Sequence, residues 1–553
     1  MICLSLVLSL VENIIYINIC LYWYVVINVS IVNYHTIIFT VLGGGLIMMK
    51  IRNYFIAFAV VFAISSAYAV IGVQDAKAQS TMGDLIQRIE ALESKGGGGN
   101  VTAPKIKGLK IGFSIRHRAE LRDDNSGNKN SATSDFTLQR MRLNLDANVN
   151  KNVRGYVQLQ DVRTWGAEQS TAGNLARVDL IQGYVDLRNL GDVSSALENV
   201  SVRLGRWQAW YGNHRLIGHL NWANEARGFD GTRVRYDNKK NARIDLFAFT
   251  IQEDQTGGVS GEGSGSVAAP GSGTDQDEYL WGMYSQFKPA SGFIVEPYLI
   301  IRNRSRDADG DRSAAANAGE QRYTYGARIA GKKMPSLPGV DFTLEQAWQS
   351  GKTEATSYRS TSIDAFAGAW GVGYTFSNVG WSPRIGYQFA YASGDDDTLD
   401  RDDESFDAIY PTGHARMGYL DFHSWQNIEA HKIEFSAKPT KKLLLKADMW
   451  FFEANEENDA WYTVAGGART GNSAAEAKNA TTNRDDEYGS ELDLTVKYKF
   501  LKNFGITAGY SHYFTGDFIE DSVNGGTGRA VGGPGTSEDS DTDWFYLQTM
   551  MKF

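Results

Sequence analysis

Residues 107–122 read KGLKIGFSIRHRAELR, a stretch in which apolar and polar side chains alternate. One face of an extended strand would carry the apolar side chains Leu109, Ile111, Phe113, Ile115, Ala119 and Leu121. The other face would carry Lys110, Arg116, Arg118 and Glu120. Such a strand needs water on one side and an apolar medium on the other. The stretch is therefore typical of the wall of a transmembrane β-barrel.

The same pattern recurs to the end of the chain and predicts about eighteen strands. They are Lys107–Arg122, Phe136–Val149, Val153–Gln160, Val178–Arg188, Val200–Arg206, Phe229–Tyr236, Ala242–Ile251, Glu278–Phe287, Phe293–Arg304, Gln321–Ala330, Val340–Gln349, Ile363–Phe376, Ser382–Ala392, Ile428–Ala437, Leu443–Phe452, Glu487–Phe500, Phe504–Phe514 and Trp544–Phe553. An even number of strands is usual for single-chain bacterial barrels. We predict an all-β fold, a transmembrane antiparallel up-and-down β-barrel over residues 105–553 in the outer membrane.

The links between these stretches alternate in length, which supports the same fold. Asn150–Asn152 and Asp237–Asn241 are short, whereas Asp254–Asp277 and Ser393–Gln426 are long. A closed up-and-down barrel produces this alternation, with periplasmic turns, extracellular loops and both ends of the barrel in the periplasm.

Composition excludes several other classes of protein. Mean hydropathy is −0.32, which argues against a bundle of transmembrane helices. A net charge of −9 gives no support to nucleic-acid binding. The two cysteines, Cys3 and Cys20, precede Met48, so the body of the protein has no cysteine chemistry.

The N-terminus has the pattern of a secretory signal. A basic start at Lys50 and Arg52 leads into an apolar run and the small-residue site Ala67-Tyr68-Ala69, which predicts a signal peptide over residues 48–69, with cleavage as late as residue 78 as the alternative. Residues 1–47 are apolar without Lys or Arg, and we interpret them as upstream read-through. An additional membrane helix is the alternative.

Residues 80–100 predict a short amphipathic helix followed by a glycine linker. Two heptads are too short for a stable isolated helix, but they could trimerise as a short coiled coil between neighbouring barrels. The alternative is a loose amphipathic leader. The barrel is therefore expected as a monomer or a trimer.

Arginine dominates the face that alternation turns toward the lumen. The candidate pore-lining residues on the predicted strands include Arg116, Arg118, Arg140, Arg142, Arg203, Arg233, Arg235, Arg302 and Arg304. Arginine stays charged and its planar fork matches a carboxylate, so such a lumen favours anions. Acidic residues share the face, and we expect them to brace about half of the arginines.

Two groups of residues resemble the alginate-export family of outer-membrane porins. The first runs from Val202 through Tyr211–Gly218 to Gly231, and the second is Tyr410–His414 with Gly418–Asp421 and Gln426-Asn427. The resemblance implies an eighteen-stranded barrel whose arginine-rich constriction passes an acidic polysaccharide.

Carried over to this chain, the resemblance assigns the constriction to Arg203, Arg206, Arg215, Arg227, Asp230 and Arg233. Arg206 has the wrong parity for the lumen unless the strand contains a bulge or ends there. Arg215 and Arg227 lie in the link after that strand, and we expect this link to fold into the pore.

Nothing in the chain has the spacing of a catalytic site or a metal site, so we predict neither an enzyme nor a cofactor. The acidic stretch Asp395–Glu404 resembles a calcium loop in composition only, and we interpret it as a solvated loop. The expected partners are an anionic polysaccharide or small anions, outer-membrane lipid and lipopolysaccharide, and the barrel-assembly machinery through Phe553. The alternative function is a general or nutrient-uptake porin for small anions.

Overall fold

The computed structural model contains two compact units, Met1–Pro104 and Lys105–Phe553. It describes residues 6–11, 14–21, 25–33, 36–41, 45–50, 108–123, 133–167, 178–252, 277–304, 319–354, 360–397, 400–468, 485–519 and 541–553. In these ranges no helix is long and apolar enough to cross a membrane.

The described residues of the first unit form a five-stranded antiparallel sheet, in the order β1-β2-β3-β4-β5. The strands are β1 (Leu6–Val11), β2 (Ile14–Leu21), β3 (Val25–Asn33), β4 (Thr36–Val41) and β5 (Gly45–Lys50). The described residues of segment 1–47 are thus strands, and the interpretation of this segment as upstream read-through stays a prediction. The predicted signal peptide beyond Lys50 and the predicted helix of residues 80–100 lie outside the described residues.

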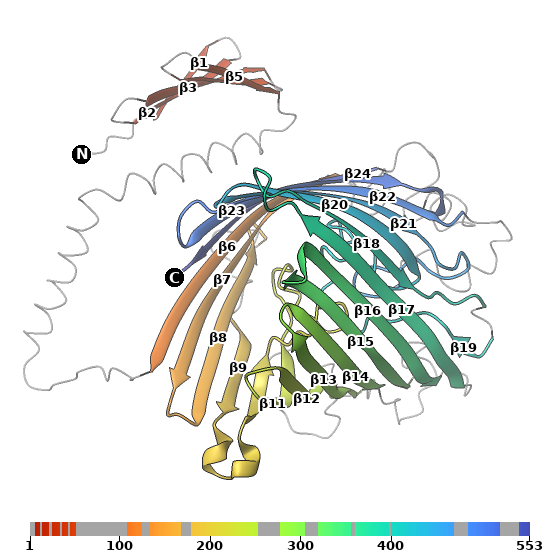
Figure 1. Cartoon of the computed structure of the whole chain (residues 1–553). Coiled ribbons are helices and arrows are strands. Elements are labelled where there is room, and N and C mark those ends of the chain that lie inside the picture. Colours follow the sequence, from red (N-terminus) through yellow and green to blue (C-terminus); the bar gives the residue numbers. More distant parts are fainter. Residues whose placement is uncertain are drawn as a thin grey trace, which may run out of the picture. The chain divides into compact units, whose positions relative to one another are not determined.

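The second unit is a closed β-barrel (Figure 1). Its first nine strands are β6 (Leu109–Asp123), β7 (Ser134–Asn148), β8 (Val153–Thr164), β9 (Asp179–Leu187), β10 (Val200–Trp207), β11 (Phe229–Asp237), β12 (Ala242–Gln252), β13 (Glu278–Ala290) and β14 (Phe293–Arg304). The others are β15 (Glu320–Met334), β16 (Leu337–Glu354), β17 (Ser360–Thr375), β18 (Arg384–Ala392), β20 (Ile428–Thr440), β21 (Leu443–Glu453), β22 (Glu487–Tyr498), β23 (Phe504–Thr515) and β24 (Thr542–Lys552). Each predicted strand is confirmed.

Neighbouring wall strands are antiparallel, and the barrel closes where β24 pairs with β6, as Phe545 lies opposite Leu121. The backbone N–H of Phe553 donates to the carbonyl of Phe113 at 2.8 Å beside this seam. A two-residue strand, β19 (Asp402–Asp403), adds a parallel pairing to β17 at the loop end of the wall. Across the part of the chain that the structure describes, eighteen long strands form the wall, as predicted.

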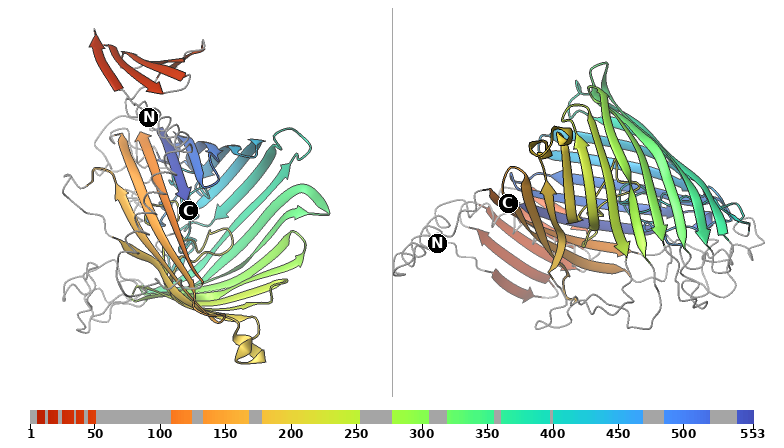
Figure 2. Two further views of the ribbon diagram at one scale, coloured as in Figure 1. Left: turned by 90° about the vertical axis from the view of Figure 1, so that its left-hand side faces the viewer. Right: turned by 90° about the horizontal axis from the view of Figure 1, so that it is seen from below.

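The links alternate around the barrel as predicted. The turns after β7, β11, β13, β15, β20 and β22 are short and lie at one rim, together with the start of β6 and the end of β24. The link after β9 (residues 188–199) lies at this rim as well (Figure 2), whereas the links after β10 and β18 leave the wall at the other rim. We call these the turn side and the loop side; general barrel architecture places the turn side in the periplasm.

The two faces of the wall have opposite chemistry. Leu204 and Val234, on adjacent strands, are 46% and 38% exposed on the outer face, where lipid would surround the barrel. On the inner face, polar side chains such as Gln158, Asp245 and Asp493 are buried. Part of the interior is thus filled, and two links whose residues the structure describes contribute to this filling.

Candidate functional site

Two links from the loop side fold back and meet inside the barrel. Loop A is residues 208–228, between β10 and β11, and loop B is residues 404–427, between β19 and β20. The N–H of Gly218 donates to the carbonyl of Tyr410 at 2.8 Å, and the N–H of Tyr410 donates to the carbonyl of Leu216 at 2.9 Å. These bonds form a short parallel bridge between Ile217 and Tyr410. Loops A and B therefore form one body.

Glycine at position 218 allows this close approach. A Cβ atom there would lie 2.2 Å from Oγ1 of Thr412, a distance that no side chain tolerates. The hydroxyl of Thr412 also accepts the N–H of Leu220 at 3.0 Å. The contact between the loops is thus specific, because any larger residue at 218 would separate them.

The arginines of β6 and β7 hold loop A from the wall. Arg116 Nη1 donates to the carbonyl of Asn221 at 2.9 Å, and Arg140 Nη1 donates to the same carbonyl at 3.1 Å. Both guanidinium groups also reach the carbonyl of Ala223, at 3.1 and 3.2 Å. Their charges meet neutral backbone acceptors, and neither residue has an ion pair in the described ranges.

Arg118 and Arg142 complete this cluster. Arg118 donates to the carbonyl of Trp222 at 2.8 Å, its guanidinium lies 3.9 Å from the centre of the Trp222 ring, and it pairs with Glu120 at 2.6 Å. Arg142 donates to Gln160 at 2.8 Å and to the side chain of Asn221 at 3.1 Å. Arg116, Arg118, Arg140 and Arg142 are only 4%, 3%, 4% and 8% exposed, so they anchor loop A rather than line an open path.

Loop B is held from the opposite wall by an acid. Glu491, buried on β22, accepts the N–H of Tyr419 at 2.5 Å and the N–H of Leu420 at 3.0 Å. Gly418, with a positive φ of 83°, brings the loop so close that a Cβ there would meet the carboxylate at 2.3 Å. One loop therefore presents carbonyls to arginines and the other presents amides to a glutamate.

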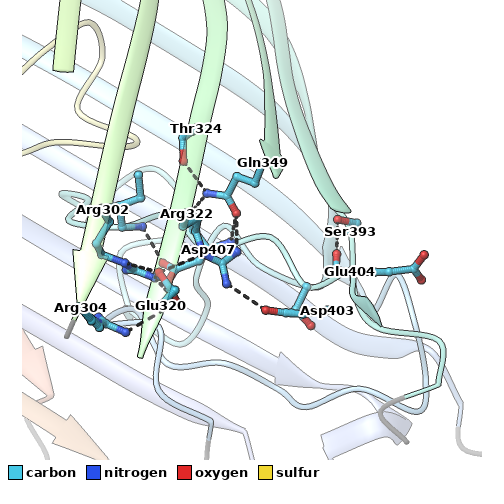
Figure 3. Close-up of polar contacts among 12 residues, drawn as sticks. Arg302, Arg304, Glu320, Arg322, Thr324, Gln349, Ser393, Asp403, Glu404 and Asp407 are labelled. Atoms are coloured by element: carbon cyan, nitrogen blue, oxygen red, sulfur yellow. Dashed lines mark hydrogen bonds and ion pairs between the residues drawn. The ribbon is translucent and has the colours of Figure 1, made fainter. Parts of the chain in front are cut away.

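On β14 and β15 the arginines Arg302, Arg304 and Arg322 are braced by carboxylates (Figure 3). Arg302 pairs with Glu320 and with Asp407 of loop B, and Arg322 pairs with Asp403 at 2.9 Å. Arg304 pairs with Glu278 at 2.9 Å. This cluster joins the wall to β19 and loop B, and its charges are compensated.

The wall of β10–β12 differs, because a cavity of about 240 Å³ remains beside it. Its lining includes Arg203, Arg233, Arg235, Arg243 and Trp210. Arg203 pairs with Asp186 at 2.7 Å and Arg235 pairs with Asp245 at 2.6 Å. Arg233 and Arg243 make no ion pair in the described part of the chain, and Nε of Arg233 is buried without a hydrogen-bond partner. We call this cavity the arginine pocket.

An aromatic side chain accompanies the charges of the arginine pocket. Trp210 of loop A is 52% exposed, and its ring centre lies 5.0 Å from that of His219. His219 in turn lies 4.9 Å from His214. Burial lowers the pKa values of both histidines to about 4, so both are neutral at pH 7. The pocket therefore combines an exposed ring with arginine charge.

Arg215 and Arg227 lie in loop A, inside the barrel, as expected. Arg215 is buried, its guanidinium is 5.1 Å from the Trp425 ring, and its Nε and Nη1 have no hydrogen-bond partner. Burial lowers the pKa of Arg215 to about 10. Arg227 donates to the carbonyl of Pro411 at 3.1 Å, so it joins loop A to loop B.

Arg206 and Asp230 lie on the outer face, not in the lumen. Their Cα atoms are directly paired between β10 and β11, and the register there runs without interruption, so the expected bulge is absent. The two side chains form an ion pair at 2.5 Å and are 36% and 55% exposed. Their assignment to the constriction is therefore wrong, because alternation continues through Gly205 to the buried Trp207.

The sequence pattern predicted which arginines face the lumen, but it did not predict the hydrogen-bond and ion-pair partners of most of them. Of the nine candidate arginines that lie on the lumen face of the strands, five have a carboxylate partner among the described residues: Arg118, Arg203, Arg235, Arg302 and Arg304. This agrees with the expectation that about half are braced. The anchoring role of Glu491 and the place of Trp210 were missed, because both depend on the course of the infolded loops.

The acidic stretch of residues 395–404 also has a compact part. Carboxylate oxygens of Asp395, Asp396 and Glu404 lie within 4.8 Å of one another, an arrangement that could accept a cation. Burial and the neighbouring Asp459 raise the pKa of Asp395 to about 7. This cluster is at the loop side and does not touch the arginine pocket.

Comparison with known proteins gives one family. The model of the family described as alginate export matches residues 107–532. No sequence relative was found among curated proteins.

Solved structures of similar fold include three of low identity. OccD3 (OpdP) of Pseudomonas aeruginosa is 12% identical, with 81% of this chain and 92% of that chain covered and a TM-score of 0.49. The outer membrane protein OprD of the same organism is 10% identical, with 80% and 93% covered and a TM-score of 0.47. OccAB1 of Acinetobacter baumannii is 14% identical, with 80% and 96% covered and a TM-score of 0.47.

Proposed function

Because the chain belongs to the alginate-export family, we propose that its barrel conducts anionic solutes, and specifically an acidic polysaccharide of the polyuronate type. Family and fold together support an outer-membrane channel. The proposal concerns what the channel selects and which side chains select it.

The arginine pocket is the observation that carries the proposal. Arg233 and Arg243 line it without a carboxylate partner among the described residues, whereas Arg116 and Arg140 are occupied by loop A. A guanidinium that has no partner can donate two parallel hydrogen bonds to a carboxylate of a passing solute. In this proposal the selecting arginines are therefore Arg233 and Arg243.

Trp210 favours a sugar acid over an inorganic anion. Its exposed ring lies in the same lining as Arg233 and Arg243. A ring of this kind offers a flat apolar surface to the C–H face of a sugar, while an arginine takes the carboxylate. The cavity of about 240 Å³ suits one sugar unit of a chain rather than a folded polymer.

The alternative function, a porin for small anions, uses the same arginines. The two functions differ in the role of Trp210, because binding of a small inorganic anion does not require an aromatic ring. The two functions are therefore separated by a Trp210→Ala variant. Loss of oligouronate block with unchanged chloride selectivity supports polysaccharide passage, whereas no loss of block favours the small-anion porin.

The decisive experiment is ion selectivity of the refolded barrel in a planar bilayer under a salt gradient, with oligouronate added as a blocker. We expect an anion-selective current that oligouronate blocks. Arg233→Gln and Arg243→Gln should each lower the anion-to-cation permeability ratio about threefold, because a unit charge roughly 7 Å from the ion contributes about 0.6 kcal/mol in water-like surroundings.

Arg206→Gln is the matched control, since it removes an arginine of the adjacent strand from the outer face. It should leave selectivity unchanged. A cation-selective current, or equal effects of Arg206→Gln and Arg233→Gln, would overturn the proposal while leaving the barrel intact.

A further inference from the structure

Lysine side chains gather at the turn-side mouth of the barrel. Lys438, Lys441 and Lys442 lie at the turn between β20 and β21. Lys497, Lys499 and Lys502 lie at the turn between β22 and β23, and Lys552 ends β24. All seven are exposed. We call these seven residues the lysine rim.

The lysine rim has no compensating acid. The seven side chains line one cavity of about 900 Å³, and no Asp or Glu side chain is among its lining residues. None of the seven makes an ion pair with a carboxylate in the ranges that the structure describes, although other lysines, such as Lys432 and Lys446, do. Seven uncompensated charges on neighbouring turns produce a strongly positive surface.

The opposite mouth has the opposite charge. The loop side carries the acidic residues Asp395–Asp397, Asp400, Asp402, Glu404 and Asp485–Glu487. A polyanion approaching that mouth meets repulsion, whereas at the turn side it meets attraction. The barrel is thus electrically asymmetric along its axis.

Two members of the lysine rim stand on the inner face of the wall. Lys497 has the same strand parity as the buried Glu491 and Asp493 on β22, and Lys552 has the parity of the buried Trp544 and Tyr546 on β24. Alternation therefore directs these two side chains toward the mouth of the lumen rather than toward lipid.

The turn-side mouth also leads to the arginine pocket. Lys240 and Lys288 line a cavity of about 1020 Å³ at this mouth, and both also line a smaller cavity of about 200 Å³ that contains Arg243. Arg243 in turn lines the arginine pocket. Shared lining residues thus connect lysines of the mouth to the unpaired arginines inside.

We propose that the lysine rim is a docking surface for an anionic polysaccharide, which it captures at the turn-side mouth before the chain enters the arginine-lined lumen. This inference rests on the proposed function. A lysine carries a compact, hydrated charge on a flexible stem, which suits loose capture of a moving polymer. The five strands of the rim span about four interstrand spacings, roughly 20 Å, which favours oligomers over single sugars.

The experiment measures the rate of current block by oligouronate added to one side of an oriented channel in a bilayer. Orientation is fixed by biotin on Glu457→Cys, an exposed position on the loop side of a barrel without cysteine after Met48, and by streptavidin binding. Replacing the seven lysines of the rim with glutamine should slow block from the turn side about tenfold or more at low salt, in line with electrostatic steering. Block from the loop side should not change.

The charge-preserving variant, with the seven lysines replaced by arginine, should retain the wild-type rate and controls for folding and insertion. The turn-side advantage should shrink as salt rises above about 0.1 M, where charges more than roughly 10 Å apart are screened. Block that is slow from both sides in the wild type, or unaltered by the glutamine variant, overturns the docking surface while the proposed function survives.

Absence of any block overturns the proposed function itself, because the lysine rim then has no polymer to capture. An acidic lipid is the remaining candidate for the rim. A glutamine variant that changes barrel stability in phosphatidylglycerol bilayers but leaves block unaltered would assign the rim to lipid and contradict the proposal.

Discussion

The arginines of β6 and β7 and the arginines of β11 and β12 face the same lumen but have different partners. Arg116 and Arg140 donate to the carbonyls of loop A, whereas Arg233 and Arg243 border a cavity. One wall is therefore covered by the backbone of loop A, whereas the other borders a cavity, and we call them the covered wall and the open wall. The same residue type anchors a loop on the covered wall and is the proposed anion site on the open wall.

The two walls still contribute to one electrostatic field. A carbonyl accepts a hydrogen bond from arginine without cancelling its charge, and Arg116, Arg140 and Arg142 have no ion pair in the described residues. By contrast, Arg302 on β14 is compensated by Glu320 and Asp407. We infer that the anchoring arginines attract anions toward a path that they do not themselves touch.

Deleting the part of loop A that covers β6 and β7 should have the largest effect on transport. The N–H of Arg227 donates to the carbonyl of His219 at 2.8 Å, so Leu220–Ala226 can be replaced by two glycines without moving the ends of the deletion. We expect single-channel conductance to rise severalfold, because these residues fill the lumen beside β6 and β7. The measurement is conductance of the refolded barrel, with far-ultraviolet circular dichroism to verify the wall.

An unchanged conductance in the deletion variant would mean that loop A does not narrow the path. The difference between a covered and an open wall would then have no consequence for transport.

A matched pair of substitutions measures the difference between the walls directly. Arg140→Met removes one of the two arginine donors that the carbonyls of Asn221 and Ala223 share with Arg116, and a hydrogen bond that involves a charged group contributes about 1.5–3 kcal/mol. Arg233→Met removes a side chain that makes no ion pair, and we expect a change within about 0.5 kcal/mol. Thermal unfolding of the two variants in detergent gives the comparison. Equal losses of stability would show that both arginines are structural.

The alternation of apolar and polar residues predicted the strands of the wall, but it could not predict which loop residues contact the inner face of the wall. Period two says which side chains face inward, and it placed Arg116 and Arg140 correctly on the inner face. The groups that occupy them, the carbonyls of residues 221–223, are more than 80 residues away in sequence. No local pattern encodes such a contact, because backbone acceptors exist at each position.

The residues that carry the family resemblance include the two segments that fold into the barrel, although the resemblance did not predict how these segments contact each other. Tyr211–Gly218 and Tyr410–His414 are the stretches that meet inside the barrel. The resemblance also misplaced Arg206, because a motif that spans a strand contains residues of both faces. The alternation of inward and outward side chains along the strand distinguishes these two faces, and it predicted the outward position of Arg206 correctly.

The histidines of loop A provide a pH test of the open wall. The pKa values of His214 and His219 are lowered to about 4 by burial, so both gain charge only as pH falls through about 4. We expect constant anion selectivity from pH 8 to pH 5 and an increase near pH 4. As pH falls from the ordinary histidine pKa near 6.5 to about 4, the unfolded chain binds more protons than the folded one. The free energy of unfolding should therefore decrease as pH falls over that range.

Carboxylates in the lumen also lose charge near pH 4, and a variant separates the two causes. Asparagine at position 214 tolerates the positive φ of 68° there, so His214→Asn with His219→Gln should preserve loop A. The extra rise of the wild type over this variant is the contribution of the histidines. Identical pH profiles would place these rings away from the ion path.

The smallest effect is expected from Arg206→Gln with Asp230→Asn. Arg206 is next to Trp207, which lines the arginine pocket, but the pair lies on the outer face and is partly exposed, where an ion pair contributes no more than about 1 kcal/mol. Selectivity and oligouronate block should equal those of the wild type, as measured in the same bilayer experiment. A loss of selectivity would contradict the parity of β10, and with it the assignment of Arg233 to the open wall, because the two strands share one uninterrupted register.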